Sequence, residues 1–310
     1  MPRILQLTVP HDAASPLIGR LSRVAGVIGI QLQTGASVHP PGDIITVQAT
    51  TASLPALMRL LDEAGVAHGP ESSVVTSEPV SLVSPSHARA LAREPSEASW
   101  EEMHQLIGKE SNMTANGLAV MAIAGVLAVV GMATEAIHVV IAGMLIAPGF
   151  EPLARVSLGL AAGGTACRHG LADTAKGYAA LLAGALIAAL ALRALGSSPL
   201  GGNPGPLVSG ALASYWSSVG AESLIVSMVA AVGGGILIAG NRTILTGGVM
   251  VALALIPSAA LLSAGLAVGD VGVALGGALR WLIDAALVVA LCWAVFAWKN
   301  ARVHRRRLRP

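Results

Sequence analysis

The chain has 310 residues, of which 54% are hydrophobic, 12% are charged and 3% are aromatic, and its formal net charge is +2. This composition excludes an ordinary soluble globule and is typical of helices in a lipid bilayer. The small net charge does not indicate nucleic-acid binding. The two cysteines, Cys167 and Cys292, lie far apart in the sequence, so they imply neither a disulfide framework nor a metal site.

The hydrophobic residues are unevenly distributed along the chain. Up to about Lys109 the sequence has the composition of a soluble protein, whereas from Asn112 to Trp298 it consists mainly of small and aliphatic residues. We therefore predict four segments in chain order: a cytoplasmic domain at 1–84, a linker with an amphipathic helix at 85–111, a transmembrane domain at 112–298 and a basic cytoplasmic tail at 299–310. Within the linker, a capping box of Ser99 and Glu102 marks the start of the helix.

The first 84 residues show the periodicity of short strands and helices. Hydrophobic residues alternate around Leu5, Ile30 and Val47, which predicts three strands, and a fourth is expected at about 73–77. Helical spacing after the first strand and around Leu57 predicts two helices. The resulting order, βαββαβ, is that of an α+β ferredoxin-like domain with one sheet face open to a partner.

Six hydrophobic segments follow, each long enough to cross a hydrocarbon core of about 30 Å. They are residues 117–134, 136–161, 177–195, 223–240, 243–268 and 271–298. Basic residues concentrate in the C-terminal tail and in the loops that six spans would place on the same side as the tail. Because cytoplasmic loops carry an excess of Lys and Arg, we expect both termini in the cytoplasm.

The second and fifth predicted spans resemble each other. The segment that contains Pro152 aligns with the segment that contains Pro257, and after a one-residue slip Gly163 aligns with Gly269. Each copy is flanked by one further span on either side, and an odd number of spans turns the second copy over in the bilayer. The predicted inverted three-helix repeats are residues 112–196 and 219–298. The alternative is that hydrophobic sequences rich in small residues resemble one another by composition.

Prolines inside two spans indicate the candidate functional residues. A proline frees a backbone carbonyl where water is absent, so it marks protein interior or a wet cavity. The predicted substrate or ion path comprises Pro148, Glu151, Pro152, Arg155, Pro257, Ser258 and Asn116. Glu151 and Arg155 are four residues apart, which fits an intrahelical ion pair as well as a substrate or proton site. Asp284 and Arg280 have the same spacing, and there we favour the ion pair.

Asn116, at the start of the first span, has two interpretations. With its neighbours Asn112 and Thr114 it either caps the helix or lines an inner vestibule, and capping is favoured. No catalytic residue, metal ligand or cofactor site is predicted.

Two runs of residues carry a family resemblance. The run VVIAGMLIAP at 139–148, followed by Pro152, and the run GVMVALALIP at 248–257 resemble the signature of the DUF389 family of hydrophobic bacterial and archaeal membrane proteins. The likeness covers roughly residues 112–298. It implies the architecture predicted above and a multi-pass protein of the bacterial inner (plasma) membrane, but no assigned activity. The sequence departs from the family pattern at Glu151 and Ser258, and at Thr134-Glu135.

These observations favour an integral membrane transporter or channel for a small solute or ion, with the cytoplasmic domain as a regulatory or oligomerising module. Transport would not be driven by ATP, because the motif Gly-x-x-x-x-Gly-Lys-Ser/Thr is missing from the sequence. We do not expect an enzyme, since the sequence has neither Gly-x-Ser-x-Gly nor His-Glu-x-x-His. The expected partners are the lipid bilayer, the unidentified solute or ion and a second copy of the chain, without nucleic acid.

The alternative function is a membrane-anchored sensor or scaffold whose cytoplasmic domain binds a ligand or partner without transport. An anchor does not require two matched proline breaks. If the two broken helices meet inside the membrane around a polar cavity, transport is favoured.

Overall fold

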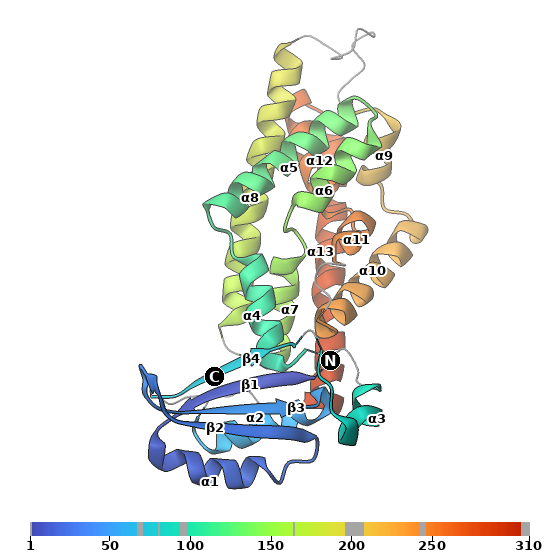
Figure 1. The fold of residues 1–310 in the computed structure, drawn as a ribbon. Coiled ribbons are helices and arrows are strands. Elements are labelled where there is room, and N and C mark those ends of the chain that lie inside the picture. Colours follow the sequence, from blue (N-terminus) through green and yellow to red (C-terminus); the bar gives the residue numbers. More distant parts are fainter. Residues whose placement is uncertain are drawn as a thin grey trace. The chain divides into compact units, whose positions relative to one another are not determined.

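A computed structural model describes residues 2–66, 71–79, 81–93, 98–163, 165–195, 208–241 and 246–304 (Figure 1). The chain divides into two compact units: the first contains the residues up to Glu102 together with residues 301–304, and the second contains the rest of the described chain. The first unit contains the predicted sheet, and the second contains the hydrophobic helices.

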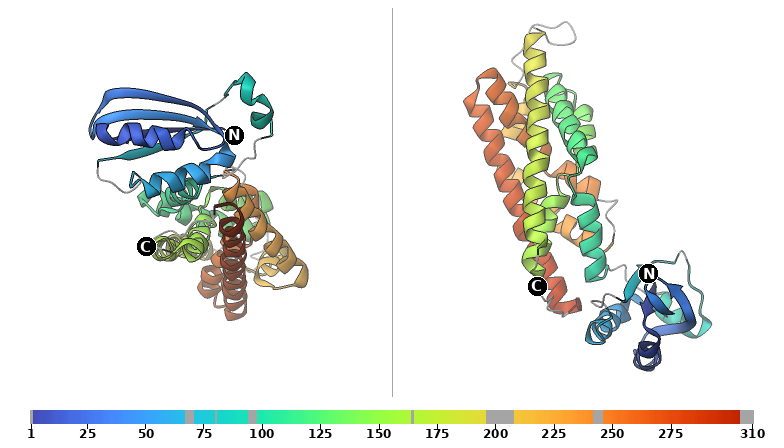
Figure 2. Two further views of the ribbon diagram at one scale, coloured as in Figure 1. Left: turned by 90° about the horizontal axis from the view of Figure 1, so that it is seen from below. Right: turned by 90° about the vertical axis from the view of Figure 1, so that its left-hand side faces the viewer.

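The N-terminal unit has one sheet of four antiparallel strands in the order β2-β3-β1-β4. Its elements follow the predicted order and are β1 (Arg3–Val9), α1 (His11–Leu21), β2 (Val27–Val38), β3 (Pro41–Ala49), a 3-10 turn (Thr51–Ser53), α2 (Leu54–Glu63) and β4 (Ser73–Ser77). The two helices lie on the same face of the sheet (Figure 2, left). The prediction of a sheet with two helices in this part of the chain is confirmed.

The core of this unit lies between the sheet and its helices. Leu7 of β1 and Ile45 of β3 are paired across the sheet and fully buried, and Leu57 of α2 is buried in the same hydrophobic cluster. On the other face of the sheet, Gln6 of β1 and its partner Val75 of β4 are exposed. This separation follows from the alternation of side chains along a strand.

Asp43 ties the β2–β3 hairpin to α1. Its carboxylate accepts a hydrogen bond from Gly35 N at 2.8 Å and lies 2.8 Å from Nδ1 of His11. The hydrogen bond from Gly35 is the main cause of a pKa of Asp43 below its usual range; His11 lowers this pKa further, and burial opposes the change.

Short helices connect the sheet to the hydrophobic helices. They are a 3-10 turn (Pro85–His87), α3 (Ala88–Leu91) and α4 (Trp100–Ser111). The predicted capping box begins α4: Glu102 N donates to Ser99 Oγ at 3.1 Å, and Ser99 N donates to Glu102 Oε2 at 2.8 Å.

The second unit is all helical. Its helices are α5 (Ala115–Ala133), α6 (Ile137–Ile146), α7 (Glu151–Ala162), α8 (Ala166–Ala194), α9 (Ala211–Ser217), α10 (Ala221–Ala239), α11 (Thr246–Ala252), α12 (Leu255–Val268) and α13 (Val271–Lys299), and a π-helical segment (Asn300–His304) follows α13. The long helix α8 packs against α5 and α12, and α13 packs against α10 and α7 (Figure 2, right).

Within the described residues, four helices are long and hydrophobic enough to cross a membrane: α5, α8, α10 and α13. The pair of α6 and α7, which is bent by 43°, makes a fifth if it counts as one span. The remaining predicted span, 243–268, is divided between α11 and α12, and α12 has 14 residues. The structure thus supports four or five candidate spans in this part of the chain, while six spans remain a prediction.

The helices of the two halves follow the same order, and the long helices agree in length. α5 and α10 have 19 residues each, and α8 and α13 have 29 each. Between them lie two shorter helices separated by a break, at 147–150 in the first half and at 253–254 in the second. The second short helix is followed in each half by a glycine with positive φ, 81° at Gly163 and 83° at Gly269. Such values favour glycine because a Cβ would clash with the backbone.

A tight corner joins α12 to α13. Next to Gly269, Asp270 caps α13 by accepting a hydrogen bond from Val273 N at 3.1 Å. A Cβ on Gly265 would lie 2.6 Å from Ala274 N, so the two helices meet almost backbone to backbone. These contacts fix the angle between α12 and α13.

Candidate functional site

Proline chemistry explains where the two breaks occur. Ala147 is extended, with φ −82° and ψ 124°, because the residue before a proline is sterically excluded from the helical region. Pro152 lies in the first turn of α7, where a missing N–H costs no helical hydrogen bond. Pro257 likewise lies in the first turn of α12, after the break at 253–254. These two prolines therefore begin a new helix rather than kink a continuous one.

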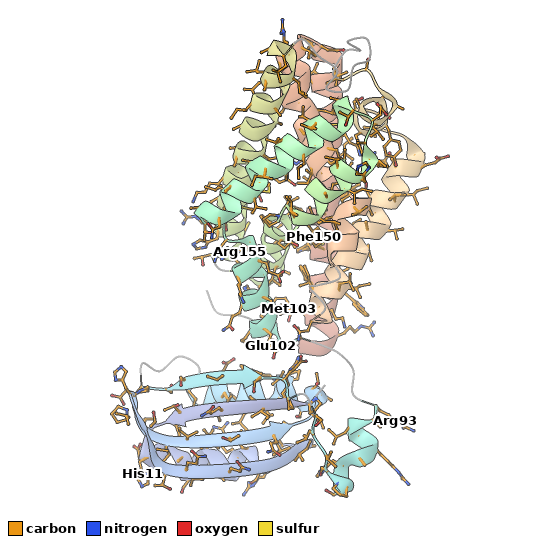
Figure 3. The ribbon with its side chains drawn as sticks, turned by 45° about the horizontal axis from the view of Figure 1, so that its top comes forward. His11, Arg93, Glu102, Met103, Phe150 and Arg155 are labelled. Carbon is orange, nitrogen blue, oxygen red and sulfur yellow. The ribbon has the colours of Figure 1, made fainter. Side chains whose placement is uncertain are left out.

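The two breaks are in contact. A Cβ on Gly149 would lie 2.9 Å from Ile256 Cδ1 and 3.1 Å from Met250 Cε, so the first break packs against α11 and α12. Phe150, which is labelled in Figure 3, is fully buried at this place. A Cβ on Gly234 of α10 would lie 2.4 Å from its ring. The first break thus lies against the two helices that flank the second break, and a meeting of the breaks around a polar cavity inside the membrane remains a prediction.

Each break has one backbone group bound by a long helix. The Tyr178 hydroxyl of α8 donates a hydrogen bond to Gly149 O at 3.2 Å. In the other half, Ala254 N donates a hydrogen bond to Asp284 Oδ2 of α13 at 3.2 Å. Unpaired backbone groups are costly in hydrocarbon, so these side chains replace the helical partners that the breaks remove.

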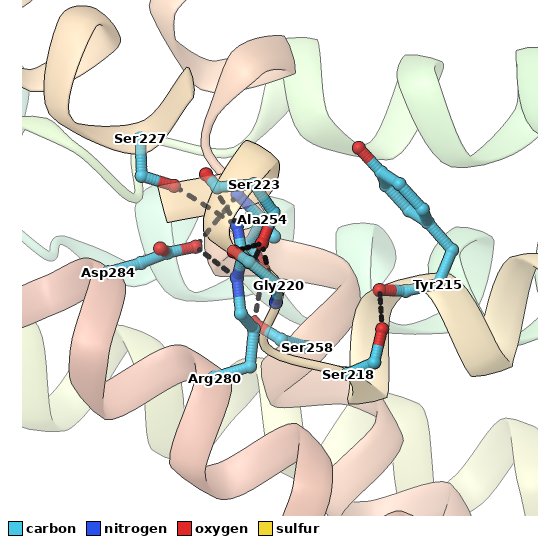
Figure 4. A network of polar contacts seen from close by, with 9 residues as sticks. All are labelled: Tyr215, Ser218, Gly220, Ser223, Ser227, Ala254, Ser258, Arg280 and Asp284. Atoms are coloured by element: carbon cyan, nitrogen blue, oxygen red, sulfur yellow. Dashed lines mark hydrogen bonds and ion pairs between the residues drawn. The ribbon is translucent and has the colours of Figure 1, made fainter. Parts of the chain in front are cut away.

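A buried polar network surrounds the second break (Figure 4). Arg280 Nε donates to Asp284 Oδ2 at 3.1 Å, which confirms the predicted ion pair. Nη2 of Arg280 donates to Ser227 Oγ at 3.1 Å, and Nη1 binds the Ser223 hydroxyl. The Ser258 hydroxyl donates to the carbonyl of Ala254. The network therefore connects α10, α12 and α13 at the second break.

One atom of this network lacks a hydrogen bond. Asp284 is completely buried, yet its Oδ1 has no hydrogen-bond partner within the part of the chain that the structure describes. Buried carboxylate oxygens are normally bonded, so this one requires an explanation.

A second network lies in the first half. Arg155 Nη1 donates to Asp173 Oδ2 at 2.8 Å, to Asn112 Oδ1 at 2.9 Å and to Ser111 Oγ at 3.2 Å. These bonds join α4, α7, α8 and the loop before α5. Burial lowers the pKa of His104 in α4, and the positive charge of Arg155 lowers it further.

The structure gives Arg155 a partner that the sequence did not predict. Asp173 of α8 forms an ion pair with it, and an ion pair between Arg155 and Glu151 remains a prediction. Sequence reasoning missed Asp173 because the third span was predicted to begin at residue 177, whereas α8 begins at Ala166. The helix starts before the predicted hydrophobic span, and Asp173 lies in its polar first turns.

Glu151 and Asp284 come from different halves and act on the same tyrosine. Glu151, with 9% exposure, is the first residue of α7, where the helix dipole stabilises a negative charge. Tyr178 lies within electrostatic range of both carboxylates. Its ring lies edge-on to Trp281, with ring centroids 4.9 Å apart.

The other predicted site residues differ in how far they are buried. Pro148 is half-buried in the first break, and Ser258 is buried at the second. Asn116 is exposed in the first turn of α5, and Thr114 caps that helix by accepting a hydrogen bond from Gly117 N at 3.4 Å. The asparagine that reaches the Arg155 network is Asn112, four residues earlier.

Within the described ranges, no three His, Cys, Asp or Glu side chains are grouped as metal ligands would be. Residues 144–290 match the family model described as "Domain of unknown function (DUF389)". This is the family that the two proline runs resemble, and the matched residues include both breaks and Asp284. No curated protein and no solved structure matches the chain.

Proposed function

We propose, from the premise that residues 144–290 match the DUF389 family, that the membrane unit is a transporter or channel for a small solute or ion that does not use ATP. In this proposal the N-terminal domain is a regulatory or oligomerising module. The observation that carries the proposal is the contact between two helix breaks, each with a backbone group bound by a buried side chain.

A membrane anchor does not need such an arrangement. Interrupted helices leave backbone groups without helical hydrogen bonds in hydrocarbon, and these groups require buried polar partners. Because this arrangement is costly, we expect it where the backbone groups have a function such as ligand binding. In secondary transporters, the ends of half-helices bind ions and solutes near the middle of the membrane. Glu151, at the start of α7, and Ser258, in the first turn of α12, would lie beside such a path. Pro148, Pro152 and Pro257 shape it.

Two inverted repeats and six spans belong to this proposal. They are supported by the equal lengths of α5 and α10 and of α8 and α13, and by the cross-packing of α7 on α13 and α12 on α8. Tyr178 and Asp284 bind breaks in corresponding positions. In a repeat of this kind α11 and α12 together would form the sixth span, with the second break in its middle.

The proposal also includes the setting of the protein. We expect the inner membrane of a bacterium, both termini in the cytoplasm and assembly into a homo-oligomer, most simply a dimer. Reporter fusions at the two termini test the orientation, and an external terminus would contradict an even number of spans. Native mass spectrometry in mild detergent tests the oligomer.

Flux measurements test the transport proposal. Purified protein is first screened for ions and metabolites that raise its melting temperature, since a ligand that binds the folded state stabilises it. Uptake of each hit is then measured in proteoliposomes that contain the wild-type protein, Glu151→Gln or Glu222→Gln. Glu222 is exposed in the first turn of α10 and serves as the matched control. We expect uptake by the wild type and the control, and reduced uptake by Glu151→Gln.

The same screen separates transport from the alternative function. A ligand whose stabilising effect is lost on substitutions in residues 1–84, and that is not taken up into vesicles, would contradict transport and favour a sensor.

A further inference from the structure

We propose that Asp284 is a proton-binding site, and that a proton on its Oδ1 controls how α13 holds the second helix break. If the membrane unit is a transporter, as proposed above, this site makes its transport proton-coupled. The proposal concerns one atom and one ion, and it can be tested before a solute is known.

The two carboxylate oxygens of Asp284 are bonded unequally. Oδ2 of Asp284 accepts hydrogen bonds from Arg280 Nε at 3.1 Å and from Ala254 N at 3.2 Å. Oδ1 is buried, and it has no hydrogen-bond partner among the described residues. A bare carboxylate oxygen in an apolar interior is unfavourable, and a bound proton removes its charge. The site therefore has a free acceptor that a proton satisfies.

Groups from several elements surround Asp284. On its own helix Asp284 faces Arg280, whose guanidinium also binds Ser227 of α10. From α10 and from the α11–α12 break the neighbouring groups are hydroxyls and backbone, which carry no charge. Tyr178 of α8 interacts electrostatically with Asp284 and also with Glu151 of α7. A proton on Asp284 competes with the ion pair to Arg280, and the guanidinium then keeps its bonds to Ser223 and Ser227.

The free oxygen suits a proton better than a metal ion. Hard metal cations require several oxygen ligands arranged around them. Asp284 offers one free oxygen, which is too few for such an ion. A proton needs one acceptor and no cavity, so the observed geometry suits a proton.

Proton binding has a direct structural consequence. Protonated Asp284 is a weaker acceptor for both Arg280 and Ala254 N, so α13 loosens its hold on the second break. Arg280 keeps its bonds to Ser223 and Ser227 of α10. Uptake of the proton thus shifts the side chain of Arg280 from Asp284 towards Ser223 and Ser227 of α10, and it weakens the hydrogen bond that holds Ala254 N at the break. No covalent bond of the chain is broken, because the proton adds to a lone pair of Oδ1 and leaves from the same atom.

The test is infrared difference spectroscopy of the full-length protein in lipid while the medium is acidified. A protonated carboxylic acid has a carbonyl band that shifts when hydrogen is exchanged for deuterium. We expect the wild-type spectrum to contain one such band that Asp284→Asn lacks. Asp173→Asn is the matched control and should keep the band, because both oxygens of Asp173 are bonded, to Arg155 and to Met113 N.

Two further measurements keep the proposal falsifiable. If Asp284→Asn fails to fold because Arg280 loses its partner, the double variant Arg280→Gln with Asp284→Asn removes the unpaired charge, and the band must be missing there too. A band that persists in both variants overturns the proposal. Loss of the Asp284 band on adding sodium at constant pH would assign the site to an alkali cation and would also overturn it.

The infrared spectrum reports the protonation of Asp284 and does not require a solute. It therefore tests the proton site independently of the proposed function. If flux is later observed, wild-type uptake should fall when the pH gradient is abolished. Undiminished uptake without a gradient would overturn the coupling and leave the proposed function in place.

Discussion

Tyr178 and Asp284 each bind a backbone group of a helix break. Their positions along two helices of equal length differ by one residue, because Tyr178 is the thirteenth residue of α8 and Asp284 is the fourteenth of α13. Tyr178 donates a hydrogen bond to a carbonyl, whereas Asp284 accepts one from an N–H group. The two halves thus meet the same structural requirement with opposite chemistry. One of the two side chains is neutral, and the other carries a charge that a proton can cancel.

Removing the Tyr178 hydroxyl should weaken the first break. We expect Tyr178→Phe to reduce the free energy of unfolding by about 1–3 kcal/mol, because Gly149 O is left buried without its partner. Chemical unfolding in detergent micelles measures the change. Tyr215→Phe is the control, since Tyr215 is 61% exposed, and its effect should stay within about 0.5 kcal/mol. Equal effects of the two substitutions would contradict the role of Tyr178.

The buried pair of Arg280 and Asp284 should be far more sensitive to the loss of one partner than an exposed pair. Asp284→Ala leaves a buried guanidinium without its counter-charge and should destabilise the protein by about 3–5 kcal/mol. Replacing both residues, as Arg280→Met with Asp284→Asn, should recover most of the loss. The exposed pair of Arg20 and Glu63 provides the comparison, where Glu63→Ala should cost less than about 1 kcal/mol.

Adjacent glycines in α10 should respond in opposite ways to the same substitution. A Cβ at Gly234 would lie 2.4 Å from the Phe150 ring, whereas a Cβ at Gly233 meets nothing within 4 Å. Gly234→Ala should therefore destabilise the protein by about 1–3 kcal/mol through overpacking. Gly233→Ala should stabilise the helix by up to about 1 kcal/mol. Thermal unfolding of both variants provides the test, and a loss of stability in Gly233→Ala as large as in Gly234→Ala would argue against the contact with Phe150.

Acid should weaken the N-terminal unit through Asp43. Its pKa in the folded protein lies below the value of 3.8 for a free side chain, mainly because of the hydrogen bond from Gly35. The stabilisation is therefore complete above that value and is lost as the pH falls through the lower pKa of the folded state. We expect the wild type to be more stable than Asp43→Asn near neutral pH, and the difference to shrink in acid.

Unfolding of full-length wild type and Asp43→Asn at a series of pH values measures that difference. Asp12→Asn, at an exposed position of α1, should change stability by less than about 0.5 kcal/mol. A constant difference between wild type and Asp43→Asn across the acid range would contradict the prediction.

The sequence predicts features that depend on near neighbours better than features that depend on distant ones. Strand alternation and helical spacing are local, and they predict the order of elements in the N-terminal unit. Pro152 and Pro257 act on their own backbone, so both breaks could be located. The ion pair of Arg280 and Asp284 follows from their spacing within one helix.

Partners from different helices could not be predicted in the same way. The pairing of Arg155 with Asp173 depends on how α7 and α8 pack, and the nearer Glu151 was the more plausible partner in the sequence. Hydropathy also placed the start of the third span at 177, because Arg168, Asp173 and Lys176 make the first turns of α8 polar. A polar segment can extend a helix when its side chains form ion pairs or hydrogen bonds with other elements of the fold.

The corner between α12 and α13 determines how movement at the second break would be transmitted. Gly265 lets the two helices touch, and Asp270 caps α13 directly after α12, so backbone contacts set the angle of this hairpin. The start of the hairpin is also bound to the middle of its second helix, because Ala254 N donates a hydrogen bond to Asp284. That bond closes a ring of 31 residues, from Ala254 to Asp284, so a change in the bonding of Asp284 reaches the second break and the corner within one closed unit.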